Sequence, residues 1–388
     1  MLEAVLQELL LAIARFFINP LLYVAIVVAI FLGYIRVKRE RKFYHIRILK
    51  GWTELKSIFS LGFTLSIALS IISIAAGLTV HVQYLIVVSV VTIICVLLFN
   101  FHLLSAIFTW GIAYGVLLYI KWQGIEIGLF GYRIEGIPWN DSSIVTVLLI
   151  IGLLLIAEGI IMHKEGAKIA SPLLEKTNRG LKSIAFFSKK ITIIPVFFLV
   201  PSNVIEPFAP WWPDFTIGAE QFGLVLFPVV IGFQQVTRRL LPVNFYPKLG
   251  RYIRILGEVT ILGGVAAYFN ARIGIIVIII ALLIRFILSV GYKMTERKDV
   301  YAVSPSKDGA MIAAVLPGSP GEKMGLVAGE IIKRVNGRAV YSERELYEAL
   351  QVNAAYCKLE VLDYQKELRL AQYAVHSEDH HQIGLIII

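Results

Sequence analysis

The sequence has few charged residues for its length and only two cysteines. Asp, Glu, Lys and Arg make up 16% of the 388 residues, whereas 57% are hydrophobic. This composition excludes an ordinary water-soluble chain and predicts that most residues lie in a lipid bilayer. Cys95 lies in an apolar run and Cys357 in a predicted strand. No disulfide framework is therefore expected.

Motifs of membrane proteases and nucleotide-binding enzymes are also missing. The sequence contains no His-Glu-x-x-His zinc motif, no Gly-x-Ser-x-Gly or Gly-Asn-Ser-Gly-Gly nucleophile loop, and no Walker or dinucleotide fingerprint. His376, His380 and His381 could bind a metal together with Asp379. No cysteine is close to them, however, and the entry to a surface strand explains them equally well. We expect no catalytic site, no metal and no cofactor.

Long apolar runs predict an α-helical polytopic membrane protein. The runs cover residues 21–35, 57–80, 82–98, 103–120, 144–162, 191–205, 222–235, 255–269 and 274–290. Two of them, 191–205 and 222–235, are short and interrupted by proline, so the sequence predicts eight or nine transmembrane helices. Residues 1–19 have the pattern of an amphipathic helix that ends at Asn19-Pro20.

The distribution of basic residues predicts the orientation. Three loops, 36–56, 164–190 and 238–254, contain eight, seven and five Lys or Arg residues, and such loops remain on the cytoplasmic side. The loop 206–220 contains two tryptophans and no basic residue, which predicts an external interface anchor. The C-terminal region is then cytoplasmic. The basic loops would also attract anionic membrane lipid.

Three ionisable residues lie inside predicted spans, where a charge is costly. Glu258 and Arg285 are equally distant from the predicted turn between the last two spans, so we expect them to form an intramembrane ion pair. Glu158 has no partner that the sequence identifies, and its role is left unassigned. It keeps a transport function open as an alternative.

Residues 309–337 have the pattern of half a PDZ domain. An alternating strand is followed by a Pro-Gly-Ser-Pro turn, a short helix that ends at Gly325, and a second strand that closes at Asn336-Gly337. The spacing resembles the PDZ domains associated with bacterial proteases, with Glu330 in place of their Asp. Such domains bind extended peptides by adding a strand to their sheet.

A peptide groove is expected between the helix at 342–350 and the end of the chain. An apolar-Gly-apolar triplet, which resembles a carboxylate-binding loop, occurs there and not before the first strand, as in a circularly permuted domain. The residues expected to form the groove are Ile383, Gly384, Leu385, Tyr347 and Leu350. In the alternative interpretation, residues 383–388 form a closing core strand that fills the groove.

Several local strings occur together along the whole chain. They are FLGYIRVKRERK at 31–42, AEG at 157–159, LYEALQ at 346–351, CKLEV at 357–361 and HHQIGL at 380–385. With a polytopic region and one C-terminal PDZ domain, the chain resembles the MinJ family of division-site topological determinants in Gram-positive rods. The resemblance implies a non-enzymatic scaffold at cell poles and septa that links the polar protein DivIVA to the division inhibitor MinD, and through it MinC.

These observations predict three regions. A polytopic transmembrane region covers residues 1–291, a short connector 292–308, and a small cytoplasmic α+β PDZ-like domain 309–388. The alternative functions are a PDZ-regulated membrane protease and a transporter subunit.

Overall fold

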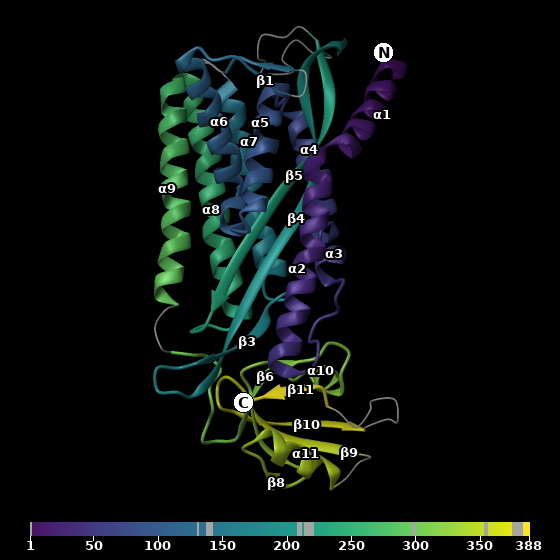
Figure 1. The fold of residues 1–388 in the computed structure, drawn as a ribbon, viewed down its shortest axis with the longest axis vertical. Coiled ribbons are helices and arrows are strands. Elements are labelled where there is room, and N and C mark those ends of the chain that lie inside the picture. Colours follow the sequence, from purple (N-terminus) through teal and green to yellow (C-terminus); the bar gives the residue numbers. More distant parts are fainter. Residues whose placement is uncertain are drawn as a thin grey trace.

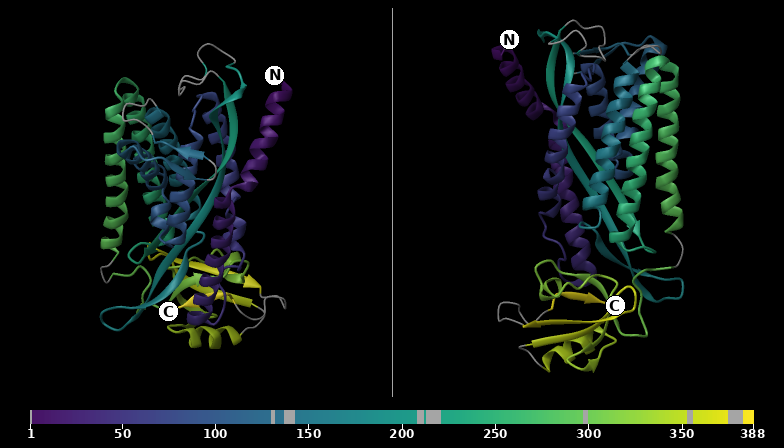
Figure 2. Two further views of the ribbon diagram at one scale, coloured as in Figure 1. Left: turned by 45° about the horizontal axis from the view of Figure 1, so that its top comes forward. Right: turned by 180° about the vertical axis from the view of Figure 1, so that it is seen from behind.

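The computed structural model describes residues 2–129, 132–136, 143–207, 212, 221–296, 300–352, 356–374 and 383–388. A bundle of apolar helices stands above a small sheet domain, and the N-terminus lies at the end of the bundle far from that domain (Figures 1 and 2). The elements of the bundle are α1 (Leu2–Ile18), α2 (Pro20–Tyr44), α3 (Thr53–Ser57), α4 (Ser60–Ala75), α5 (Val82–Leu97), η1 (Phe101–Leu104), α6 (Ala106–Gln123), β1 (Ile127–Leu129), β2 (Tyr132–Ile134), α7 (Ser143–Glu165), β3 (Ser171–Lys176), β4 (Lys182–Ile205), β5 (Phe222–Thr237), α8 (Pro242–Phe269) and α9 (Ala271–Thr295).

Among the described residues, five helical stretches are long and apolar enough to cross a membrane. They are Pro20–Tyr44, Thr53–Ala75, Ser143–Glu165, Pro242–Phe269 and Ala271–Thr295. The predicted count of eight or nine spans is not confirmed. The break between α1 and α2 is as predicted, because Asn19 caps α2 by accepting a hydrogen bond from the backbone N–H of Leu21 at 3.0 Å.

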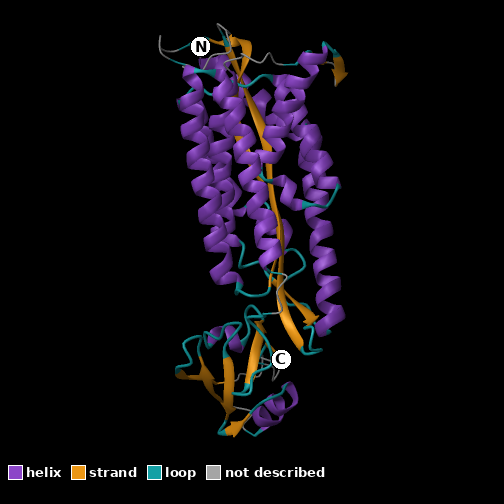
Figure 3. Ribbon diagram, turned by 90° about the vertical axis from the view of Figure 1, so that its left-hand side faces the viewer, coloured by secondary structure: helices purple, strands orange, loops and turns teal. Residues whose placement is uncertain are grey.

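The runs at 191–205 and 222–235 are not helical spans but strands, and this part of the prediction is wrong. Strands β3, β4 and β5 form an antiparallel sheet in the order β3-β4-β5. Figure 3 shows the β4–β5 ribbon running along the length of the bundle between the helices. The two runs are rich in Ile, Val and Phe, whose branched or aromatic side chains favour a pleated surface.

Helix α4 covers the outer edge of β4. Gly62, Ser66 and Ser70 are four residues apart and therefore share one face of α4. The hydroxyl of Ser66 donates to the carbonyl of Pro195, and the hydroxyl of Ser70 accepts from the backbone N–H of Phe197 at 3.0 Å. An exposed strand edge is not tolerated in hydrocarbon, and these hydroxyls satisfy the edge from within the protein.

The C-terminal domain is a sheet with two short helices. Its elements are β6 (Ala310–Val315), α10 (Pro320–Lys323), β7 (Ile331–Val335), β8 (Arg338–Ala339), α11 (Glu343–Gln351), β9 (Tyr356–Leu362), β10 (Leu368–Ala374) and β11 (Leu385–Ile387). The strand order is β10-β9-β7-β6-β11, and β8 pairs with β7. Asn336 and Gly337 both have positive φ, 49° and 85°, as the tight turn between β7 and β8 requires.

Candidate peptide-binding groove and buried charge network

Strand β11 is the edge strand next to β6. The backbone N–H of Leu316 donates to the carbonyl of Gly384 at 2.8 Å, and Ile388 exchanges hydrogen bonds of 3.0 and 3.3 Å with Met311. Backbone groups of successive residues in a strand point alternately to its two sides. Between these anchors, the N–H and C=O groups of Leu385 and Ile387 therefore point away from β6. No strand of the described residues pairs with this side of β11. The side offers backbone groups that could pair with an added peptide strand.

Gly384 is held in a conformation that other residues rarely adopt. Its φ is 74°, and a Cβ atom at this position would lie 2.7 Å from the hydroxyl oxygen of Ser319. Glycine is therefore needed at this position for the strand to enter the fold. A substitution of Gly384 would disturb the domain itself, so it cannot test peptide binding separately from folding.

Helix α11 begins with a capping box. Ser342 accepts from the backbone N–H of Glu345 at 3.3 Å, and Glu345 accepts from the backbone N–H of Tyr341 at 2.8 Å. Tyr347 and Leu350 are half-buried, and Leu350 packs against the domain core. Whether these two side chains line a groove stays a prediction.

Two of the predicted groove residues, Ile383 and Leu385, belong to the hydrophobic core of the domain. Ile383, Leu385 and Ile387 are buried together with Leu346 of α11. Strand β11 therefore has the core side chains expected of a closing strand, while its backbone edge is unpaired among the described residues. The two interpretations of the C-terminal segment describe different parts of the same strand.

An ion pair between a buried glutamate and a partly exposed arginine, which the sequence does not predict, fixes the start of β7. Glu330 is 3% exposed and accepts three hydrogen bonds from Arg369 of β10, one from Nε at 2.9 Å and two from Nη2 at 2.7 Å. It also accepts from the backbone N–H of Val327 at 3.0 Å. The longer Glu, in place of the Asp of related PDZ domains, reaches across the sheet edge to an arginine. No motif in the sequence links positions 39 residues apart, so only the fold reveals this pair.

The domain is docked on the base of the bundle. The outward side chain of Ile386 is buried against Ile184, Leu241 and Val303. Ile184 also bonds to Val303, with its N–H donating to the carbonyl at 3.0 Å. The residues Ile48, Ile184 and Leu241 in this cluster come from the three basic loops, so all three loops reach the side of the bundle where the PDZ domain lies.

A second polar contact ties the connector to the bundle. Arg238 donates to both carboxylate oxygens of Glu175 at 2.7 and 2.9 Å, and the hydroxyl of Tyr301 donates to the same carboxylate at 2.9 Å. Burial raises the pKa of Glu175, but the hydrogen bonds from Arg238 and Tyr301 outweigh it and hold the pKa below its ordinary value.

Inside the bundle, Arg285 of α9 pairs with Glu158 of α7. The Nη2–Oε1 distance is 2.8 Å, and the two side chains are 2% and 0% exposed. The hydroxyl of Ser105 donates to Glu158 at 2.6 Å and accepts from Nε of Arg285 at 3.1 Å. Arg285 also donates to Ser289 at 2.6 Å, and the N–H of Ala106 donates to Glu158 at 3.2 Å. The network joins α7, α9 and the start of α6.

The predicted pair of Glu258 and Arg285 is wrong. Glu258 lies half-exposed on α8, 3.6 Å from Arg254 on the same helix. Equal depth in two helices does not decide which faces meet, and α9 presents Arg285 toward α7. Glu158, for which the sequence identifies no partner, is the true counter-charge.

Comparisons with known proteins agree with this architecture. A family model described as "PDZ domain" matches residues 311–362. The chain is 30% identical over 386 residues to the "Cell division topological determinant MinJ" of Bacillus subtilis, a similarity that covers 98% of this chain and 95% of that protein. The chain belongs to the MinJ family. The resemblance predicted from the sequence strings is therefore confirmed.

Other MinJ family members are more distant. Proteins of Lacticaseibacillus paracasei and Lacticaseibacillus casei, both named "Probable cell division topological determinant MinJ", are each 22% identical over 374 residues, covering 95% of this chain and 96% of theirs. No solved structure matches the chain. The PDZ match ends at residue 362, so it leaves out β10 and β11, which complete the sheet of this MinJ family member.

No group of three or more potential metal ligands occurs among the residues whose placement is described. The alternative metal ligands His376, His380 and His381, with Asp379, lie outside the described residues.

Proposed function

We propose that this chain is a membrane scaffold in division-site selection. The observation that carries the proposal is the similarity to a protein named as a cell division topological determinant, which extends over 98% of the chain, so that the bundle and the PDZ domain are both included. Neither the name of a matched relative nor a matched family model indicates a catalytic activity. A non-enzymatic role fits this pattern.

The proposed partners follow from the family. The scaffold would link a DivIVA-like polar protein to MinD, and through it MinC, so that septa do not form near cell poles. It would lie at poles and at the septum as a multi-pass protein of the cell membrane. The three basic loops support a cytoplasmic PDZ domain, because they lie on its side of the bundle. The proposed regions are 1–291, 292–308 and 309–388.

Peptide recognition by strand addition is the proposed binding mode. The unpaired edge of β11 would supply the hydrogen bonds, and Tyr347 and Leu350 of α11 would contact alternate side chains of the peptide. The transport alternative depended on an unpartnered Glu158. Its ion pair with Arg285 removes that reason, because the carboxylate now has a structural role.

Complementation tests the cellular role. The chain, fused to a fluorescent protein, is expressed in Bacillus subtilis cells that lack their own MinJ relative. We expect polar and septal fluorescence, recovery of MinD positioning and fewer minicells than in the parent deletion strain. Uniform membrane fluorescence together with unchanged minicell formation would contradict the proposal.

Substitutions in β11 and α11 test the groove. Ile387→Pro removes an N–H that points away from β6. The hydrogen bonds to β6 are therefore kept, while a hydrogen-bond donor for the bound peptide is lost. Ile387→Ala is the matched control for the lost side chain. Tyr347→Ala is compared with Tyr341→Ala, a tyrosine that is 57% exposed just before the helix. Partner recruitment that persists in Ile387→Pro and Tyr347→Ala would place the binding surface elsewhere.

A further inference from the structure

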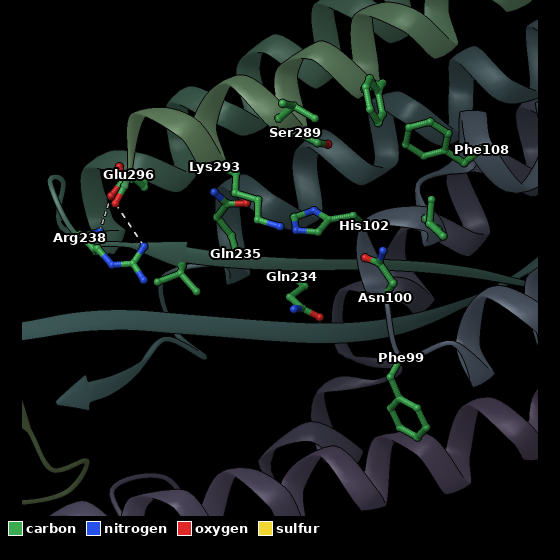
Figure 4. A pocket seen from close by; sticks show the side chains of 14 residues that line it. Phe99, Asn100, His102, Phe108, Gln234, Gln235, Arg238, Ser289, Lys293 and Glu296 are labelled. Atoms are coloured by element: carbon green, nitrogen blue, oxygen red, sulfur yellow. Dashed lines mark hydrogen bonds between the residues drawn. The ribbon is translucent and has the colours of Figure 1, made fainter. Parts of the chain in front are cut away.

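A cavity of about 540 Å³ lies between η1, β5 and the last turns of α9. Figure 4 shows the side chains of His102, Gln235 and Lys293 gathered between these three elements, with Asn100 beside them. The apolar part of the lining includes Phe286 of α9. One cavity therefore combines hydrogen-bonding groups and hydrocarbon-like surface.

The amide of Gln235 has unmet hydrogen-bonding capacity in this cavity. Gln235 is only 6% exposed, and its side chain forms no hydrogen bond with any described residue. Gln234, the preceding residue of β5, points to the opposite side of the strand (Figure 4). An unpaired amide in an apolar bundle costs free energy, so the arrangement favours a ligand that supplies polar atoms.

The charge balance of the cavity is positive. Arg238 is neutralised by Glu175, and the carboxylate of Glu296 accepts from the backbone N–H groups of Arg238 and Arg239. Lys293 forms no ion pair within the described part of the chain. Lys189, which donates to the carbonyl of the lining residue Phe99 at 2.9 Å, likewise has no carboxylate partner there. An anionic ligand is favoured over a cationic one.

The position along α9 decides what kind of anion fits. A helix rises about 1.5 Å per residue, so Phe286 lies about 22 Å and Lys293 about 33 Å from the start of α9 at Ala271. The hydrocarbon core of a bilayer is about 30 Å thick. The cavity therefore lies across the boundary between hydrocarbon and headgroups, on the side of the PDZ domain.

We propose that this cavity binds the phosphate headgroup of an anionic phospholipid from the leaflet on the PDZ side. Lys293, His102 and the amide of Gln235 would donate to the phosphate oxygens. The acyl chains would follow the lipid-facing surface at Phe286, which is 55% exposed. This placement gives the amide of Gln235 and the uncompensated lysine a single ligand.

Lipid titration of the purified full-length protein in detergent tests the proposal. Phosphatidylglycerol and phosphatidylcholine are added separately, and native mass spectrometry gives the dissociation constant of each. We expect phosphatidylglycerol to bind more tightly. Lys293→Gln should weaken its binding about fivefold, the effect of removing one basic residue near an anionic group. Lys164→Gln, an exposed lysine at the PDZ-side end of α7, is the matched control and should leave the affinity unchanged.

Gln235→Leu separates binding from folding. Because the amide is unpaired, its replacement by an apolar group of similar size should keep or raise the melting temperature without lipid, while phosphatidylglycerol binds more weakly. Affinity unchanged in both Lys293→Gln and Gln235→Leu would overturn the proposal, as would an equal loss in Lys164→Gln. If millimolar inorganic phosphate alone gave the same stabilisation as phosphatidylglycerol, the ligand would be a free anion, and the lipid assignment would be wrong.

Discussion

Breaking the ion pair between Glu158 and Arg285 should destabilise the bundle strongly. Both side chains are buried, at 0% and 2% exposure, and their charged atoms are 2.8 Å apart. At this distance the attraction is about 6 kcal/mol for an effective dielectric constant of about 20. Desolvation of each charge costs several kcal/mol, so the intact pair contributes little net stability, but a single unpaired charge remains costly.

The expected magnitudes follow from this balance. Arg285→Met leaves Glu158 with only the donors Ser105 and Ala106 and no counter-charge, which should cost about 3–5 kcal/mol. Glu158→Gln leaves the arginine uncompensated and should cost a similar amount. The double variant removes both charges, and Gln can still accept from Ser105. It should therefore be more stable than either single variant, with a coupling energy of about 2 kcal/mol or more.

Unfolding of the purified protein in detergent, followed by circular dichroism, measures these differences. The matched control is Glu258→Gln, because the pair of Glu258 and Arg254 is half-exposed and 3.6 Å apart on one helix. Such a pair contributes about 0.5 kcal/mol or less. The reasoning is refuted if Arg285→Met is no more damaging than Glu258→Gln, or if the double variant loses the sum of the two single losses.

Three further outcomes are expected. Ser70→Ala should cost about 1–3 kcal/mol in the same unfolding assay, because it leaves the N–H of Phe197 without its acceptor. The hydroxyl of Ser89 bonds only within its own helix, so Ser89→Ala should cost less. The pKa of Glu175 is lowered in the folded protein, so its stabilising contribution is complete above the ordinary value of 4.5 and is lost as the pH falls through the folded-state pKa. Limited proteolysis near residue 300 should therefore increase in acid, and Glu175→Gln should remove this pH dependence. Burial raises the pKa of Cys357 to about 12, so roughly one thiol in ten thousand is ionised at pH 8. Maleimide should therefore label Cys357 only after denaturation, and rapid labelling of this thiol in the native protein would show that the PDZ core opens readily.

The PDZ half-domain could be predicted because its signals are local. Gly325 and the Asn336-Gly337 pair have the positive φ values that their positions in the pattern require, and Ser342 caps the helix that follows. Each signal depends on neighbours within a few residues. Local steric and hydrogen-bonding rules are enough to place such elements.

The charge network could not be predicted in the same way. Arg36 shows this for the basic loop 36–56. The sequence suggests only one of several topology charges, yet Arg36 is 5% exposed and donates to Glu40 at 2.8 Å and to Glu54 at 2.5 Å. The same limit applies to Arg285. Sequence gives the depth of a charged residue in a span but not the face that its helix presents to its neighbours.

The two strands inside the bundle were mistaken for helical spans because a continuous apolar run has no periodicity that separates the two structures. Their prolines suggest breaks in short helices, but they lie within paired strands. Pro195 lies opposite Pro228 in the β4–β5 ladder, and its carbonyl accepts from Ser66, on the side away from β5. Its missing N–H therefore belongs to the outer edge of β4, where an unpaired donor would be costly in an apolar environment. Proline at this edge removes one donor and the serines of α4 satisfy other groups, so the residues that obscured the strands in the sequence are the ones that allow a strand edge inside the bundle.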